Sequence, residues 1–178
     1  MDLREEDEME VRQRKVLREG RNIDILIEQL NHVSIPYRVK AATELGKIHH
    51  QGAVAALIRS LLDPEDDVVY VVIRSLGALR DPAAVEPLIG CLQDADRWVR
   101  RGVAHALGEI MDPRAIPSLC VLLDDERPEV RAAAAEALGK IGDPSVCELI
   151  RPLLEDRKDA VQDAAWEALR MLSERTEG

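Results

Sequence analysis

A repeat of 31 residues constrains the fold of this chain more than any other feature of its sequence. The clearest copy runs over residues 94–113 and recurs, shifted by 31 positions, over residues 125–144. Both stretches begin with Asp, carry Val-Arg near their start and Leu-Gly near their end, and finish with Asp-Pro. A fixed period of this length is typical of a solenoid, in which one supersecondary unit stacks on its neighbours.

The pattern inside each period predicts two helices. In the third unit Val85, Leu88, Ile89 and Leu92 follow the i, i+3, i+4, i+7 spacing that places one apolar face against a core. Because 46% of the residues are hydrophobic but none is Phe, the core must consist of Leu, Ile, Val and Ala. We therefore predict an all-α fold, a right-handed α-solenoid of about five helix pairs. The predicted units lie near residues 22–48, 52–79, 83–110, 114–141 and 145–172.

Two kinds of residue mark the ends and contacts of these helices. Asp-Pro pairs precede the third, fourth and fifth units, where Asp is expected to cap the helix and Pro to occupy its first turn. A glycine recurs late in each second helix, at Gly46, Gly77, Gly108 and Gly139. Since glycine costs a helix about 1 kcal/mol relative to Ala, its recurrence indicates that neighbouring helix backbones approach closely there. Arg170 occupies this position in the fifth unit, as expected where stacking stops.

Residues 1–21 lie outside the repeat. An acidic block comes first and a basic block follows, with few apolar residues between them. We interpret this segment as a charged N-terminal arm or as a short helix that caps the first repeat. The alternative is a docking tail that folds on a partner.

Composition and charge exclude several classes of function. The net charge of -10 disfavours a nonspecific grip on nucleic acid phosphates. No run of about 18 apolar residues could cross a membrane, and no apolar signal-peptide core is present, so we expect a cytoplasmic protein. The three cysteines do not form a disulfide framework, and Cys120 and Cys147 fall at core positions of the repeat. We expect no metal and no cofactor.

The repeat resembles the HEAT repeat, specifically the short 31-residue variety first described in phycobilin lyases. The resemblance covers about residues 22–172 and is clearest over 94–110 and 125–141, where Asp, Val-Arg and Leu-Gly-x-Ile stand in order. It implies a binding scaffold in which the second helices line the concave side.

The resemblance also implies a ladder of hydrogen bonds between units, made by the Asp before each second helix and the Arg six residues later. Two pairs, Asp94/Arg100 and Asp125/Arg131, have this spacing. Val69 and Gln162 stand in place of the Arg in the second and fifth units, which predicts that the ladder is broken there.

Some relatives with HEAT-like repeats are enzymes. Deoxyhypusine hydroxylases bind iron through His-Glu dipeptides, but His32, His49, His50 and His105 are not followed by Glu in this chain. That activity is therefore excluded, and we expect no enzyme. The resemblance alone leaves phycobilin lyases open.

Candidate binding residues occupy the face of the second helices that is opposite to the core. In the third unit this face carries Trp98, Arg101, His105 and Glu109, and the same positions in other units form four columns along the solenoid. The non-recurring residues in these columns are of the types that dominate binding hot spots. The predicted partner-binding residues are Tyr70, Arg74, Trp98, Arg101, His105, Glu109 and Glu136. In the alternative interpretation, Trp98 folds over a neighbouring helix end and Arg101 is only solvated.

The sequence thus predicts a noncatalytic scaffold or adaptor that binds a partner protein or peptide on its concave face. An acidic or mixed peptide, or a partner helix, is the expected occupant. We expect a monomer or weak homodimer, in which Trp166 covers the open end of the core or forms a dimer contact. The rival prediction is a phycobilin-lyase-like or chaperone-like accessory factor for a chromophore or metalloenzyme.

Overall fold

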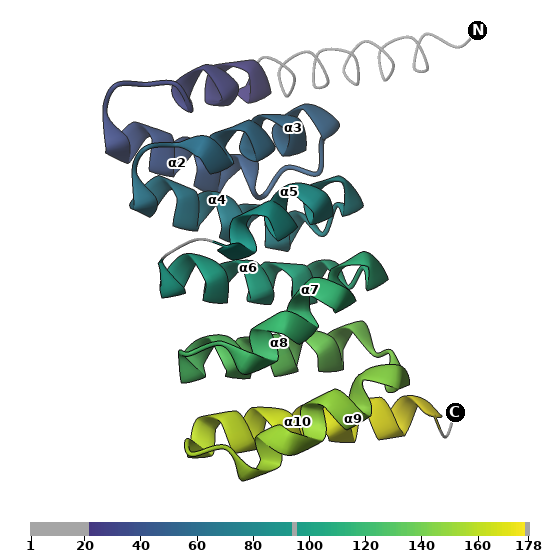
Figure 1. Ribbon diagram of the computed structural model, residues 1–178. Coiled ribbons are helices and arrows are strands. Elements are labelled where there is room, and N and C mark those ends of the chain that lie inside the picture. Colours follow the sequence, from purple (N-terminus) through teal and green to yellow (C-terminus); the bar gives the residue numbers. More distant parts are fainter. Residues whose placement is uncertain (1–21, 94–95, 177–178) are drawn as a thin grey trace, which may run out of the picture.

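The computed structural model is a row of stacked helix pairs, and it describes residues 22–93 and 96–176. The pairs follow one another in chain order from the purple N-terminal end to the yellow C-terminal end (Figure 1). Among the described residues every regular element is helical, which confirms the predicted all-α solenoid. The segment 1–21, predicted as an arm or capping helix, lies outside the described residues.

Each unit consists of a short first helix and a longer second helix. The first unit contains helical residues 22–29 and α2 (Ile35–Leu45). The later second helices are α4 (Asp66–Leu79), α6 (Arg97–Ile110), α8 (Pro128–Ile141) and α10 (Asp159–Thr176). The later first helices are α3 (Gln51–Arg59), α5 (Val85–Gly90), α7 (Ile116–Val121) and α9 (Cys147–Ile150).

Short 3-10 segments flank these first helices. Three of them begin at the proline of an Asp-Pro pair: η2 (Pro82–Ala84), η4 (Pro113–Ala115) and η6 (Pro144–Val146). Four others end the first helices: η1 (Ser60–Leu62), η3 (Cys91–Gln93), η5 (Leu122–Asp124) and η7 (Arg151–Glu155). The capping Asp residues accept hydrogen bonds from backbone N–H groups two residues later, at 2.8 Å for Asp81 and 2.9 Å for Asp112 and Asp143. The predicted caps are therefore confirmed.

One continuous core runs through the stack between the two layers of helices. The predicted apolar stripe is buried at Val85, Leu88 and Leu92, and the facing positions of α6 are buried at Val99 and Val103. The thiols of Cys120 and Cys147 are partly buried and pack against this core, as their position in the repeat predicts.

The recurrent glycines lie where second helices touch. A Cβ atom added to Gly108 would stand 2.8 Å from the Cα atom of Ala137 in the next unit, and one added to Gly77 would stand 2.9 Å from the Cα atom of Ala106. These distances are too short for any side chain without a shift of the backbone. Arg170, at the equivalent position of α10, is exposed and pairs with Glu167 and Glu174 on its own helix. The close approach predicted from the sequence is therefore confirmed.

Arginine–aspartate ion pairs also tie the units together, which confirms the predicted ladder between units, but each Arg forms its ion pair with the Asp of the next unit, whereas the prediction paired it with the Asp six residues before it. In three of the second helices, one Arg binds the Asp that lies 25 residues later, in the next unit. The pairs are Arg38–Asp63 at 2.7 Å, Arg100–Asp125 at 2.8 Å and Arg131–Asp156 at 2.7 Å. In each pair both carboxylate oxygens accept from the guanidinium group, which makes the contact bidentate.

Two expectations about this ladder are corrected. The Arg131 guanidinium donates to the backbone carbonyl of Asp125 at 2.8 Å, and its ion pair is with Asp156 instead. The ladder is not broken at Asp156, because Arg131 of the preceding unit forms an ion pair with its carboxylate. The Gln162 side chain also donates a hydrogen bond to the Asp156 backbone carbonyl at 2.6 Å. Spacing within one unit could not reveal a partner in the next unit. Asp94 lies outside the described residues.

The carboxylate of Asp125 stays charged because arginine compensates for its burial. Burial alone would raise the pKa of Asp125, but hydrogen bonds from the Arg100 side chain and the Arg127 backbone N–H lower this pKa below its ordinary value. The pair therefore contributes to stability at neutral pH.

The last described helix leaves an aromatic ring uncovered. The residues equivalent to Trp166 in earlier units, Ile73, Ala104 and Ala135, are fully buried by the unit that follows each of them. Trp166 itself is 61% exposed on α10. Its predicted role as an end cap or a dimer contact stays a prediction.

We predict that Gly108→Ala destabilises the protein, although Ala favours helices more than Gly. The added methyl group must displace the α8 backbone at Ala137, and overpacking of this kind costs about 1–3 kcal/mol. Chemical denaturation of the variant measures the loss.

Gly90→Ala is the matched control, because no atom lies within 4 Å of a Cβ built at Gly90. Its stability should equal or slightly exceed that of the wild type. A stabilised Gly108→Ala variant would contradict the close-contact interpretation.

Candidate functional site

The outward face of the second helices is hollowed into a groove of about 660 Å³. Its walls come from α4, α6 and α8, with Ala160 of α10 at one edge. The structure brings all seven predicted residues to this groove: Tyr70, Arg74, Trp98, Arg101, His105, Glu109 and Glu136. They converge because the same face of each second helix points away from the core in every unit.

Two aromatic side chains rise above the floor of the groove. Trp98 is 46% exposed near the start of α6, where its backbone N–H is held by the side chain of the N-cap Asp96. Tyr70 is 40% exposed on α4, and its ring lies beside Gly102, where an added Cβ would meet it at 3.7 Å. Half-exposed aromatic rings of this kind can bury further apolar area against a ligand.

Small residues form the floor between these aromatic rings. They are not among the predicted binding residues, because Gly and Ala suggest no chemistry by themselves. The sequence feature that indicates this floor is the absence of any large side chain at successive outward positions of the second helices. The floor residues are Gly77, Ala78, Gly102, Ala106, Ala132, Ala133 and Ala160.

Positive charge is concentrated at the α4–α6 end of the groove. The guanidinium carbons of Arg97 and Arg101 lie 5.0 Å and 5.7 Å from the centre of the Trp98 ring, within the range of a cation–π contact. Arg97 also pairs with Glu129 at 3.3 Å. The side chains of Arg74 and His105 make no hydrogen bond or ion pair with the described residues, so they are available to a ligand.

Glu109 is already engaged within the protein. Its carboxylate accepts from Lys140 of the next unit at 2.6 Å and from Arg80 of the preceding unit at 2.7 Å. Hydrogen bonds from Lys140 and then Arg80 lower the pKa of Glu109 to about 2. Although Glu109 lines the groove as predicted, its charge is compensated, and it ties three units together along one wall.

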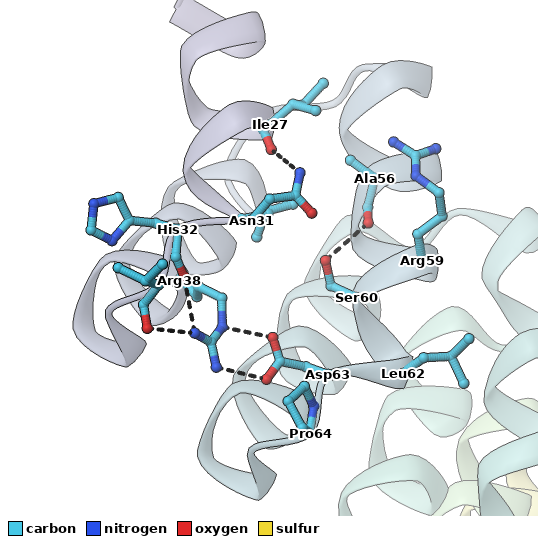
Figure 2. Close-up of a pocket in the computed structure, with 12 residues that line it drawn as sticks. Ile27, Asn31, His32, Arg38, Ala56, Arg59, Ser60, Leu62, Asp63 and Pro64 are labelled. Carbon is cyan, nitrogen blue, oxygen red and sulfur yellow. Dashed lines mark hydrogen bonds and ion pairs between the residues drawn. The ribbon is translucent and has the colours of Figure 1, made fainter.

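A second cleft, of about 420 Å³, lies between the first helices of the first two units. Figure 2 shows Asn31 on one side of it and Ala56 and Ser60 on the other, with the Arg38–Asp63 pair nearby. The small side chain of Ser60 leaves space here, whereas the larger residues at the equivalent positions of the fourth and fifth units, Leu122 and Leu153, are buried in the core. The cleft was not predicted, although Ser60 and Cys91 of the second and third units stand where the fourth and fifth units have Leu.

The described residues show neither a metal cluster nor a membrane-spanning helix. No three His, Cys, Asp or Glu side chains in this part of the chain are grouped so that they could hold a metal ion. No described helix is both long enough and apolar enough to cross a bilayer.

Comparison with protein families finds a match to the family described as HEAT repeats. The match covers residues 23–101, 59–126 and 116–177 in three overlapping segments. Comparison with curated proteins finds no significant match.

Comparison with solved structures finds similar repeat proteins. One is the complex of CpcE and CpcF of phycocyanin lyase from Nostoc sp. PCC7120, with 33% identity and a TM-score of 0.77; the match covers 85% of this chain and 65% of that chain. An engineered protein is 24% identical with a TM-score of 0.63, over 90% of this chain and 83% of that chain. A designed armadillo repeat protein in complex with the peptide (KR)4 is 19% identical with a TM-score of 0.64, over 89% and 84%. The last two show similarity of fold alone.

We predict that Glu109→Gln destabilises the protein at neutral pH and has little effect near pH 2. Because the pKa of Glu109 is about 2 in the folded protein and has an ordinary value of 4.5, the charged carboxylate stabilises the fold above pH 4.5. That contribution is lost as the pH falls through 2. We expect a neutral-pH loss of about 1 kcal/mol, typical of partly exposed ion pairs.

Urea denaturation of both proteins between pH 2 and pH 7 measures this difference. A gap that stays constant over the whole pH range would show that the Glu109 charge does not stabilise the stack.

Proposed function

Because this chain belongs to the HEAT repeat family, we propose that it is a noncatalytic scaffold or adaptor that binds a partner protein or peptide in the groove of its second helices. One observation carries the proposal. The seven outward residues selected from the repeat pattern all line a single groove that combines exposed aromatic rings with uncompensated charge. Such a combination is what concentrates binding energy in protein interfaces.

The centre of the proposed interface is the cluster of Trp98, Arg101 and Tyr70. Trp and Tyr bury large areas with little loss of side-chain entropy, and Arg can donate two parallel hydrogen bonds to a carboxylate. The Arg101 guanidinium already lies over the Trp98 ring, so a ligand carboxylate would meet a guanidinium that is partly held in place. This preorganisation lowers the entropic cost of binding.

The charge of the groove favours a partner segment that is acidic or of mixed charge. Arg74 and Arg101 would attract carboxylates, whereas Glu136 on α8 would attract a cation. The similar structures include a complex of two proteins and a repeat protein with a bound peptide. They support the general idea that solenoids of this fold present surfaces to proteins.

Three further expectations accompany this proposal. A cytoplasmic location, the monomeric or weakly dimeric state and the lack of nucleic acid binding stay predictions from the sequence. The net charge of -10 supports the last of these.

We predict that the double substitution Trp98→Ala, Arg101→Ala weakens partner binding at least tenfold and leaves the fold intact. Both side chains lie on the surface of α6, so their loss opens no cavity in the core. Loss of two hot-spot residues costs at least about 1.4 kcal/mol, which is a factor of ten in Kd. Affinity capture from cell extract identifies the partner, and calorimetry then measures its affinity for each variant.

The matched control is Val121→Ala, Arg151→Ala, which removes one exposed apolar and one exposed cationic side chain from the first helices. It should bind as the wild type does. A folded groove variant that keeps full affinity for every captured partner would rule out the proposed interface.

A second candidate function is that of a lyase-like or chaperone-like accessory factor for a chromophore or a metalloenzyme. The 33% identity to the phycocyanin lyase structure favours its chromophore form, although this chain covers 65% of that chain. The groove offers Trp98, Tyr70 and Arg101 as the only evident cradle for a pigment among the described residues.

We predict that titration with a linear tetrapyrrole leaves the visible absorption of the pigment unchanged. A saturable shift at one pigment per chain, absent in the groove double variant, would support the second function over the scaffold.

A further inference from the structure

We infer that the occupant of the groove is an α-helix, with carboxylates facing α4 and α6 and cations facing α8 and α10. This inference rests on the proposed function, because it specifies the partner of the same groove. Three features of the groove lead to it: its hydrogen-bonding capacity, its floor and its distribution of charge.

The groove offers little to an extended backbone. None of the described residues that line it is Asn, Gln, Ser or Thr, and the backbone groups of its helical floor are used within their own helices. An extended peptide would therefore depend on the Arg, His, Tyr, Trp and Glu side chains of the groove for partners, and each N–H or C=O group that it buried without one would cost about 1–3 kcal/mol. A helix satisfies its own backbone groups before it binds.

The floor also suits the close approach of a helix. Helix axes pack 8–10 Å apart, depending on the size of the side chains at the contact. Gly77 and Ala106 already allow α4 and α6 to pack closely within the stack, and the same two residues line the groove. A ligand helix can therefore pack one apolar face between the Trp98 and Tyr70 rings, as in helix-in-groove recognition.

Charged side chains without a partner are distributed unevenly along the groove. The cations without a partner among the described residues are Arg74 on α4 and Arg101 on α6, apart from the contact of Arg101 with the Trp98 ring. Among the lining residues the carboxylate without one is that of Glu136 on α8, and the exposed Asp163 of α10 lies outside the lining. Between them, Glu109 and Glu129 are paired with Arg80, Lys140 and Arg97. Pairing in the middle leaves net positive charge at one end and net negative charge at the other.

Two displayed peptide libraries test this inference on the chain of 178 residues. One presents random side chains on one face of an alanine-rich helix, and the other presents them between prolines, which prevent a helix. Each library is selected on the wild type and counter-selected on Trp98→Ala, Arg101→Ala. We expect groove-dependent binders at least ten times more often from the helical library, with Asp or Glu at one end and Lys or Arg at the other.

Double-mutant cycles on one selected peptide then locate its ends. Arg101→Ala should couple to the peptide carboxylates and Glu136→Ala to its lysines, each with a three- to tenfold effect on Kd at low salt that shrinks at high salt. The crossed pairs should show no coupling.

The outcomes separate the two proposals. Groove-dependent binders that come mainly from the proline library, or that couple in the opposite sense, overturn the helix inference and leave the proposed function standing. If neither library yields a binder that depends on the groove, both proposals are wrong.

Discussion

The stack of second helices depends on close contacts between a glycine of one helix and an alanine of the next. At Gly77, Gly108 and Gly139 the backbone of one helix lies against an Ala of the next, at distances that exclude even a methyl group. This contact sets how close neighbouring units come. The ion pairs follow from it, because each guanidinium group must reach the carboxylate of the next unit, and the continuous burial of Leu, Ile and Val follows as well.

The groove follows from the same geometry. Once the helices are close, the residues that face outward from α4, α6 and α8 form one surface, and its depth depends on which of them are small. Gly102 and Ala106 keep the floor low, whereas Trp98 and Tyr70 raise the walls. The scaffold and the candidate site therefore share residues: Gly77 and Ala106 hold two helices together and also line the groove.

Much of this could be predicted from the sequence because the 31-residue period repeats the same environment. The period places Val99 and Trp98 on opposite faces of one helix, and the capping Asp residues follow from local chemistry alone. The period alone does not show which residue of a neighbouring unit a given side chain contacts. Arg131 lies six residues after Asp125 and 25 residues before Asp156, and only the stacking geometry selects the distant Asp156 for its ion pair. The cleft at Ser60 and the floor of small residues were missed for a related reason, since an absent side chain defines space only after its neighbours are placed.

The interlocking of the units has a consequence for how such an array can change length. The fourth unit contributes Arg131 to the following unit and Asp125 to the preceding one, so a duplicated copy of this unit would carry both the Arg and the Asp that its junctions need. Each internal second helix likewise carries both the glycine and the small residue that its two neighbours need. In α10 the glycine is replaced by Arg170, which is bound to two glutamates of its own helix. Gene duplication can therefore insert units within this solenoid by simple copying, whereas a copy placed directly after α10 would require a mutation at Arg170 first.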